Sequence, residues 1–88
     1  MHRQRGDPDT ALDHYQQALN IQREVGDRAG EAVTRFNIAL ALRELGRLLD
    51  AVAELEVVVE LDRAVGHPEL ESDTEFLEQV RAELIENG

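Results

Sequence analysis

The feature that most constrains this 88-residue chain is a repeat with a period of forty residues. Shifting the chain by forty positions brings identical residue types together at several places. These pairs are Gly6 and Gly46, Ala11 and Ala51, Arg23 and Arg63, Val25 and Val65, Gly26 and Gly66, and Phe36 and Phe76. A repeat of this length made of paired helices is the signature of an α-solenoid, in which each repeat packs on its neighbours.

Apolar residues recur every three or four positions through most of the chain, which predicts amphipathic helices. Gly46 and Gly66 follow two of these stripes, where a residue with positive φ usually ends a helix. We expect four helices, over about residues 8–25, 28–45, 48–65 and 68–86 or 72–86. The short connections between them predict antiparallel packing, so the expected fold class is all-α.

The starts of these helices are predicted from residues that cap helices. Asp7 and Asp27 precede the first two helices, where an aspartate side chain can accept a hydrogen bond from a free backbone N–H group. The last helix has two alternative starts. Pro68 could occupy its first position, or Ser72 and Glu75 could form a capping box.

The residues at the repeated positions resemble the tetratricopeptide repeat family. The resemblance covers nearly the whole chain, and the forty-residue period is similar to the long-repeat type of kinesin light chains and bacterial regulators. It rests on Phe36-Asn37-Ile38-Ala39, Gly46, Ala51 and Leu55, and on the earlier copy Gly6, Ala11, Tyr15, Ala18 and Leu19. The family implies one domain over residues 1–88: the second half of a repeat at 8–27, a full repeat at 28–66 and a capping helix at 67–88.

Composition restricts the classes of partner. Residues 1–49 hold seven acidic and seven basic side chains, whereas residues 50–88 hold twelve acidic and two basic ones, so the net charge of −10 lies in the second half. This charge disfavours nucleic acid, which requires clustered lysine and arginine, and favours a basic partner. There is no apolar run long enough to span a membrane and no secretory leader, so we expect a cytoplasmic protein.

Catalytic and metal-binding patterns are weak. The chain has no cysteine, and its histidines are His2, His14 and His67. A triad can be written with His14 and Ser72, but no strand–turn–helix elbow supports it. The helical carboxylates lack the Glu-x-x-His pairs of a carboxylate metal site, and no glycine-rich phosphate loop is present. We therefore expect no enzyme, no cofactor, no metal and no small-molecule substrate.

The family resemblance implies a concave groove lined by the first helices of successive repeats. Carried over by motif position, the expected partner-binding residues are Val33, Phe36, Leu40, Arg43, Glu44, Asp73, Phe76, Val80 and Glu83. An apolar floor with charged edges suits an extended or helical protein segment. For Phe36 two interpretations stay open, because apolar residues at helical spacing are often buried in a core.

Two functions follow from these observations. The first is a non-catalytic protein–protein interaction module, part of a larger bacterial regulator or scaffold, that binds a peptide or protein in the groove. The alternative is a homodimer. The helix over residues 8–25 lacks the first helix of its repeat and is expected to expose Leu12, Tyr15 and Leu19, and a second copy would bury this apolar patch.

Overall fold

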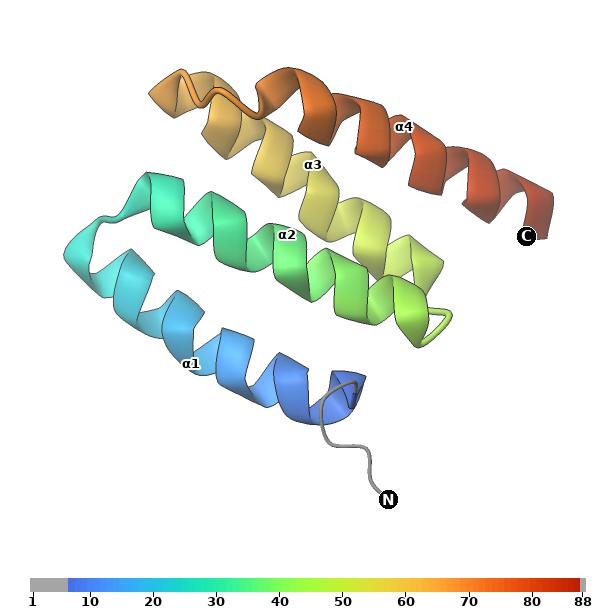
Figure 1. Cartoon of the computed structure of the whole chain (residues 1–88), viewed down its shortest axis with the longest axis horizontal. Coiled ribbons are helices and arrows are strands. Elements are labelled where there is room, and N and C mark those ends of the chain that lie inside the picture. Colours follow the sequence, from blue (N-terminus) through green and yellow to red (C-terminus); the bar gives the residue numbers. More distant parts are fainter. Residues whose placement is uncertain (1–6, 88) are drawn as a thin grey trace.

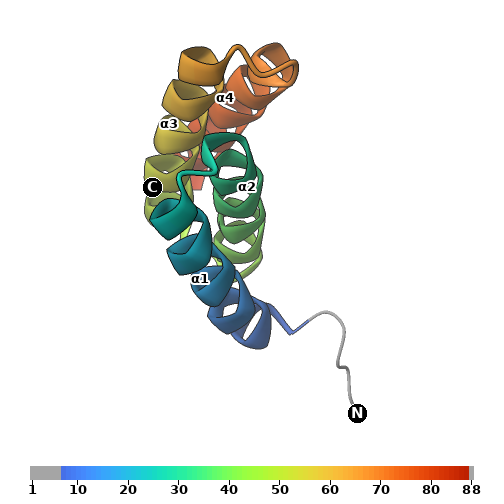
Figure 2. The ribbon, with the colours of Figure 1, turned by 90° about the vertical axis from the view of Figure 1, so that its left-hand side faces the viewer.

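The computed structural model describes residues 7–87, and in this part of the chain it contains helices and no strand. The helices are α1 (Pro8–Val25), α2 (Arg28–Glu44), α3 (Leu48–Val65) and α4 (Leu70–Asn87). Each helix packs antiparallel against the next one in the chain (Figure 1). In Figure 2, α2 and α4 lie on one side of the molecule and α1 and α3 on the other. The all-α solenoid is therefore confirmed.

The first two helix starts have the predicted caps. Asp7 precedes α1 and accepts a hydrogen bond from the backbone N of Asp9 at 3.1 Å, with Pro8 at the first helical position. Asp27 precedes α2 and accepts from the backbone N of Gly30 at 2.9 Å. A cap of this kind contributes about 1 kcal/mol to stability. Gly26 and Gly66 end α1 and α3 with φ of 76° and 66°, backbone angles that residues with a Cβ rarely adopt.

Both predicted starts of the last helix were wrong. Helix α4 begins at Leu70, two residues after Pro68, so Ser72 lies inside the helix and does not cap it. His67 lies in the turn before the helix, where its Nδ1 accepts a hydrogen bond from the backbone N of Glu69 at 3.0 Å.

The core lies along the interfaces of α1 with α2, of α2 with α3 and of α3 with α4. Its main members are Leu19, Ile38, Ala39, Leu42, Ala51, Val52, Leu55, Val59, Leu77 and Val80. Leu55 and Val58 of α3 are completely buried, which overrides the preference of the valine run for a strand. Complete burial of a leucine or valine stabilises the folded state by about 1.5–3 kcal/mol.

Two expectations about exposure need correction. Val80 was expected to face the groove, but it is completely buried because α4 turns this side chain toward the core. Leu19 was expected to be exposed, but only 3% of it is accessible, because α1 rests on the core through this side chain. Leu12 and Tyr15 are half-buried against the same core.

Candidate protein-binding groove

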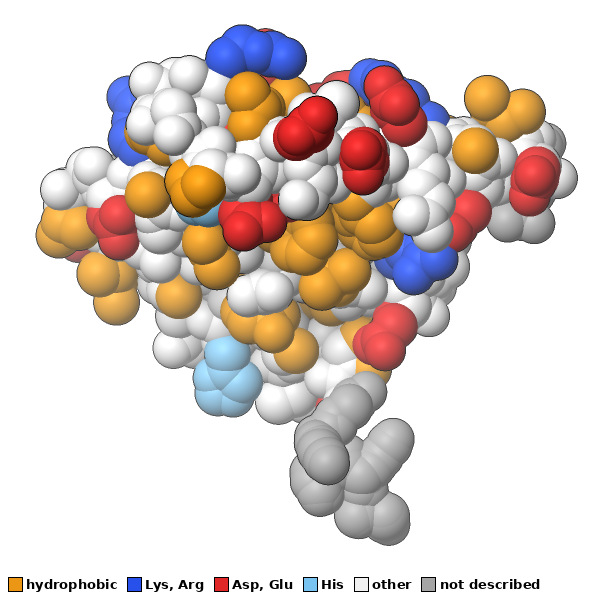
Figure 3. All heavy atoms as spheres, turned by 45° about the horizontal axis from the view of Figure 1, so that its top comes forward, with side chains coloured by type: hydrophobic (Ala, Val, Ile, Leu, Met, Phe, Trp, Pro, Cys, Tyr) orange, Lys and Arg blue, Asp and Glu red, His pale blue; other side chains and the backbone are white. Residues whose placement is uncertain are grey.

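The open face between α2 and α4 is the candidate binding surface, and we call it the α2–α4 groove. Phe36 of α2 and Phe76 of α4 form its floor, with ring centroids 5.3 Å apart and an angle of 49° between the planes. Both rings are half-buried. Hydrophobic side chains gather in the middle of this face, with acidic side chains around them (Figure 3). Both interpretations of Phe36 therefore apply, because it packs against the core and also lines the groove.

One end of the groove carries an ion pair between α2 and α4, which we call the arginine end. Arg43 donates two hydrogen bonds to Glu83, from Nε to Oε1 at 2.9 Å and from Nη2 to Oε2 at 2.5 Å. The guanidinium carbon of Arg43 lies 5.7 Å from the centre of the Phe76 ring, within the range of a cation–π contact. The hydrogen bonds raise the pKa of Arg43 and lower the pKa of Glu83.

The other end of the groove holds a cavity of about 320 Å³, which we call the acidic pocket. It is lined by Val33, Phe36, Asp62, His67, Glu69, Ser72, Asp73 and Phe76. Asp62, near the end of α3, is completely buried. Neither of its carboxylate oxygens accepts a hydrogen bond from the part of the chain that the structure describes. A carboxylate in such a position normally has a hydrogen-bonding or charged partner.

Asp73 shares this pocket with Asp62. The pKa of Asp73 is raised to about 7, mainly by burial and then by hydrogen bonding with Asp62 and by the charges of Asp62 and Glu69. Two neighbouring carboxylates behave in this way because both cannot easily be ionised at once. A proton held on Asp73 can supply the hydrogen bond that Asp62 otherwise lacks.

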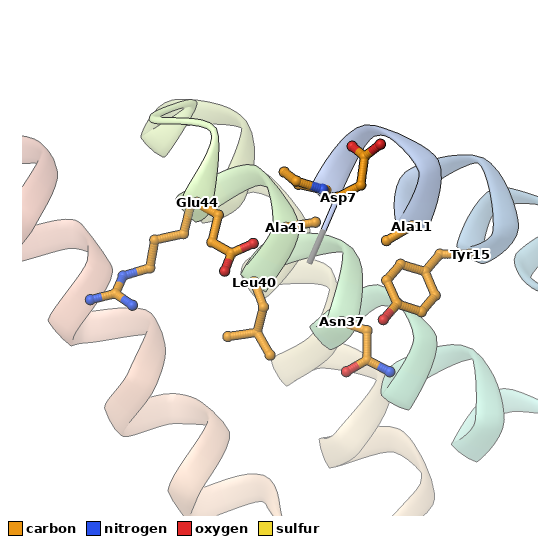
Figure 4. A pocket seen from close by; sticks show the side chains of 9 residues that line it. Asp7, Ala11, Tyr15, Asn37, Leu40, Ala41 and Glu44 are labelled. Carbon is orange, nitrogen blue, oxygen red and sulfur yellow. The ribbon is translucent and has the colours of Figure 1, made fainter. Parts of the chain in front are cut away.

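A second cavity, of about 280 Å³, lies between α1 and α2 and is called the α1–α2 pocket. Tyr15 of α1 and Asn37, Leu40 and Glu44 of α2 are among its lining side chains (Figure 4). Leu40 is 38% exposed. This pocket adjoins the arginine end, because Arg43 lines both it and the cavity beside Glu83.

The structure brings most of the expected groove residues together, in two places. Val33, Phe36, Asp73 and Phe76 line the acidic pocket. Leu40, Arg43 and Glu44 line the α1–α2 pocket, and Glu83 pairs with Arg43. Val80 is the exception, because it is buried in the core.

Asp62 and His67 were missed as groove residues. Asp62 follows Leu55 and Val58 at helical spacing, so it occupies a core position of the α3 stripe. A charged residue at a core position was the available signal. His67 carried no comparable signal, since its place in the pocket depends on the path of the chain between α3 and α4.

Within residues 7–87, there is no group of three or more histidine, aspartate or glutamate side chains placed to hold a metal ion. Over the same residues, the structure has no helix that is both long enough and apolar enough to cross a bilayer.

Comparison with known proteins identifies the family. The chain is 39% identical over 70 residues to the 43 kDa receptor-associated protein of the synapse from Tetronarce californica. This alignment covers 76% of the chain but only 16% of that relative. No solved structure gave a significant match. A sequence model of the tetratricopeptide repeat matches residues 1–64, which hold α1, α2 and nearly all of α3. The chain therefore belongs to the tetratricopeptide repeat family.

Proposed function

We propose that the chain is a protein–protein interaction module that binds a peptide or a segment of a partner protein in the α2–α4 groove. Membership of the tetratricopeptide repeat family supports a role as a protein-interaction scaffold. The similar synaptic protein is described as receptor-associated, which also favours a protein partner. The observation that carries the proposal is the Phe36–Phe76 pair, which offers an aromatic floor on an open face between two charged ends.

The charge of the groove favours a basic segment as its occupant. Asp62, Glu69 and Asp73 line one end, and the chain as a whole carries a net charge of −10. Complementary charge of this kind acts mainly by accelerating association, and its effect falls as salt screens it. The apolar floor between the ends would supply most of the contact area, as it does in other recognition grooves.

The test is a binding selection with a matched pair of variants. The intact chain is used to select peptides from a displayed random library, and the affinity of the selected peptides is measured by calorimetry. Val33→Arg places a large charged side chain in the groove, where Val33 is 52% exposed. Leu49→Arg makes the same change on α3, at a side chain that is 69% exposed and lines neither pocket.

We expect Val33→Arg to weaken binding at least tenfold and Leu49→Arg to leave it unchanged. Circular dichroism should show that both variants are as helical as the parent chain. If the two variants bind the selected peptides equally well, the groove is not the binding surface.

Self-association through α1 is the second candidate function. The observation that favours it is the α1–α2 pocket, where Tyr15 and Leu40 leave apolar surface accessible on adjacent helices. The burial of Leu19 makes this surface smaller than the sequence indicated. Light scattering over a tenfold concentration range tests the idea directly. A dimer that Tyr15→Glu converts to a monomer would support it, and a monomeric parent chain at every concentration would reject it.

A further inference from the structure

The acidic pocket contains an unusual pair of groups for a protein interior. The carboxylate of Asp62 is buried without a hydrogen-bond donor from the described residues, and Asp73 beside it is half-buried. Removing a carboxylate from water costs several kcal/mol unless a partner replaces the lost hydrogen bonds. Asp73, which lines the same cavity, is a second acid, so repulsion between the two carboxylates adds to this cost whenever both are ionised.

Other partly buried acids of this chain show how such groups are normally accommodated. Glu31 and Glu54 both bind Arg35, at 3.0 and 2.9 Å. Glu83 binds Arg43, whose guanidinium also lies over the ring of Phe76. In each case a guanidinium from the same chain neutralises the carboxylate. None of the residues that line the acidic pocket is an arginine or a lysine.

Apart from the arginine, the acidic pocket contains the same kinds of side chain as the arginine end, namely carboxylates and an aromatic ring. Phe76 contributes to both, and in the acidic pocket Phe36 stands beside it, so aromatic surface and carboxylates occur together at each end. Arginine suits this combination better than lysine, since a planar guanidinium can stack on a ring while it donates two hydrogen bonds to a carboxylate. A cavity of about 320 Å³ lies in the size range of small-ligand sites.

We propose that the acidic pocket binds the guanidinium group of an arginine side chain from a partner protein. The inference rests on the proposed function, because it names the side chain that the α2–α4 groove would recognise. Asp62 is out of reach of solvent, so Asp73 is the carboxylate that the guanidinium contacts first. Asp62 lies deeper in the pocket, and its negative charge adds to the attraction for the guanidinium. Binding requires the proton on Asp73 to leave. The guanidinium then takes the place of that proton beside the two carboxylates, and the net charge of the pair with its cation stays at −1.

A single protected residue tests the pocket without a partner. N-acetyl-L-arginine amide is titrated into the isotopically labelled full chain at pH 8, and amide shifts are followed by NMR. N-acetyl-L-citrulline amide serves as the matched control, because it has nearly the same shape and no charge. We expect saturable shifts around Asp73 and Phe76 with a Kd on the order of millimolar for the arginine compound, and none for citrulline.

Three variants locate the binding. Asp73→Asn removes the contacting carboxylate and Asp62→Asn removes the charge behind it, so each should weaken arginine binding at least tenfold. Glu60→Gln removes one negative charge from an exposed position of the same helix as Asp62 and should leave binding unchanged. Circular dichroism confirms that the variants are folded.

Several outcomes would overturn the proposal. They are equal shifts from arginine and citrulline, no saturable shift up to about 50 mM, or unchanged arginine binding by Asp62→Asn and Asp73→Asn. The last result would mean that the arginine compound binds at a place other than the acidic pocket. Failure here is distinct from failure of the groove: selected peptides that lose affinity with Val33→Arg but not with Asp73→Asn would establish the groove and reject the arginine pocket.

Discussion

The two ends of the α2–α4 groove use the same kinds of side chain with opposite results. At the arginine end, Glu83 is paired with Arg43, and the guanidinium lies over Phe76. In the acidic pocket, Asp62 and Asp73 meet beside the same ring, and no arginine or lysine is among the residues that line the cavity. The difference shows that one end is electrostatically complete within the folded chain, whereas the other holds unneutralised charge.

Solvent exposure decides how much each arrangement matters for stability. The Arg43–Glu83 pair is about one-third exposed, at 38% and 27%, so water already solvates both charges and the pair adds little. Asp62 is completely buried and accepts no hydrogen bond from the described residues, so a proton on Asp73 or an added cation would lower the cost of its charge. Stability and binding should therefore respond very differently to changes at the two ends.

The largest expected effect is the loss of the ring that both ends share. Phe76→Ala should lower the free energy of unfolding by about 2–3 kcal/mol, less than for a fully buried phenylalanine because Phe76 is half-buried. Urea unfolding followed by circular dichroism measures the change. Leu49→Ala, at an exposed position of α3, is the control and should change little. If Phe76→Ala prevents folding, Phe76→Leu provides a milder test. A decrease in the free energy of unfolding below about 1 kcal/mol for Phe76→Ala would show that the packing of this ring contributes little at either end of the groove.

The next effect has the opposite sign. Asp62→Asn removes a buried charge and keeps the shape of the side chain, so it should stabilise the chain at pH 8 by about 1–3 kcal/mol. For a chain of this size the melting temperature should rise by roughly 4 °C or more. Glu60→Gln is the matched loss of charge at an exposed site and should produce no comparable rise. A lower melting temperature for Asp62→Asn would mean that Asp62 has a partner that stabilises its charge.

The acidic pocket should also make the stability of the chain depend on pH, through the proton on Asp73. The pKa of Asp73 is about 7 in the folded chain, whereas an unfolded aspartate has a pKa of about 3.9. Between these values the folded state binds more protons than the unfolded state, so Asp73 lowers stability progressively as pH rises from about 4 to about 7. Asp73→Asn removes this pH-dependent contribution to stability.

Urea unfolding of both chains from pH 4.5 to 8.5 tests this expectation. The stability of Asp73→Asn relative to the parent chain should increase up to about pH 7 and stay constant above it. A difference that does not vary with pH would show that Asp73 is ionised throughout and that no proton is shared.

The smallest expected effect is at the arginine end. Arg43→Gln should lower the melting temperature by a few degrees at most, because the pair is partly solvated, and the difference should shrink at high salt. Arg47→Gln, which breaks the more exposed pair with Asp50, is a suitable control and should have a still smaller effect. A loss at Arg43 as large as that of Phe76→Ala would contradict the distinction drawn between the two ends.

Local sequence signals were sufficient for most of the fold. The apolar spacing predicted the four helices, Asp7 and Asp27 marked two starts, and Gly26 and Gly66 stand at two ends, because caps and helix stops depend on a few neighbouring residues. The start of α4 was predicted wrongly. Ser72 and Glu75 fit a capping pattern, but the turn at 68–69 is short and the helix begins at Leu70, before Ser72.

The candidate groove was predictable only in part. The period placed Phe36 and Phe76 one repeat apart, and the structure shows their rings in contact. The same reasoning assigned Val80 to the groove and Leu19 to an exposed patch, although both are buried. A helical stripe is wider than the face that one neighbour covers, so periodicity alone does not say which of its edges remains accessible.

By itself, the sequence determined the class of fold, the repeat and the family, since each of these depends on residue types at regular intervals. Only the tertiary structure decided which charges meet. Asp62 and Asp73 are eleven positions apart on different helices, and Arg43 and Glu83 are forty apart. Whether an acid finds a cation or another acid depends on how α2, α3 and α4 are rotated against one another. That rotation is set by the packing of the whole core, which no local pattern encodes.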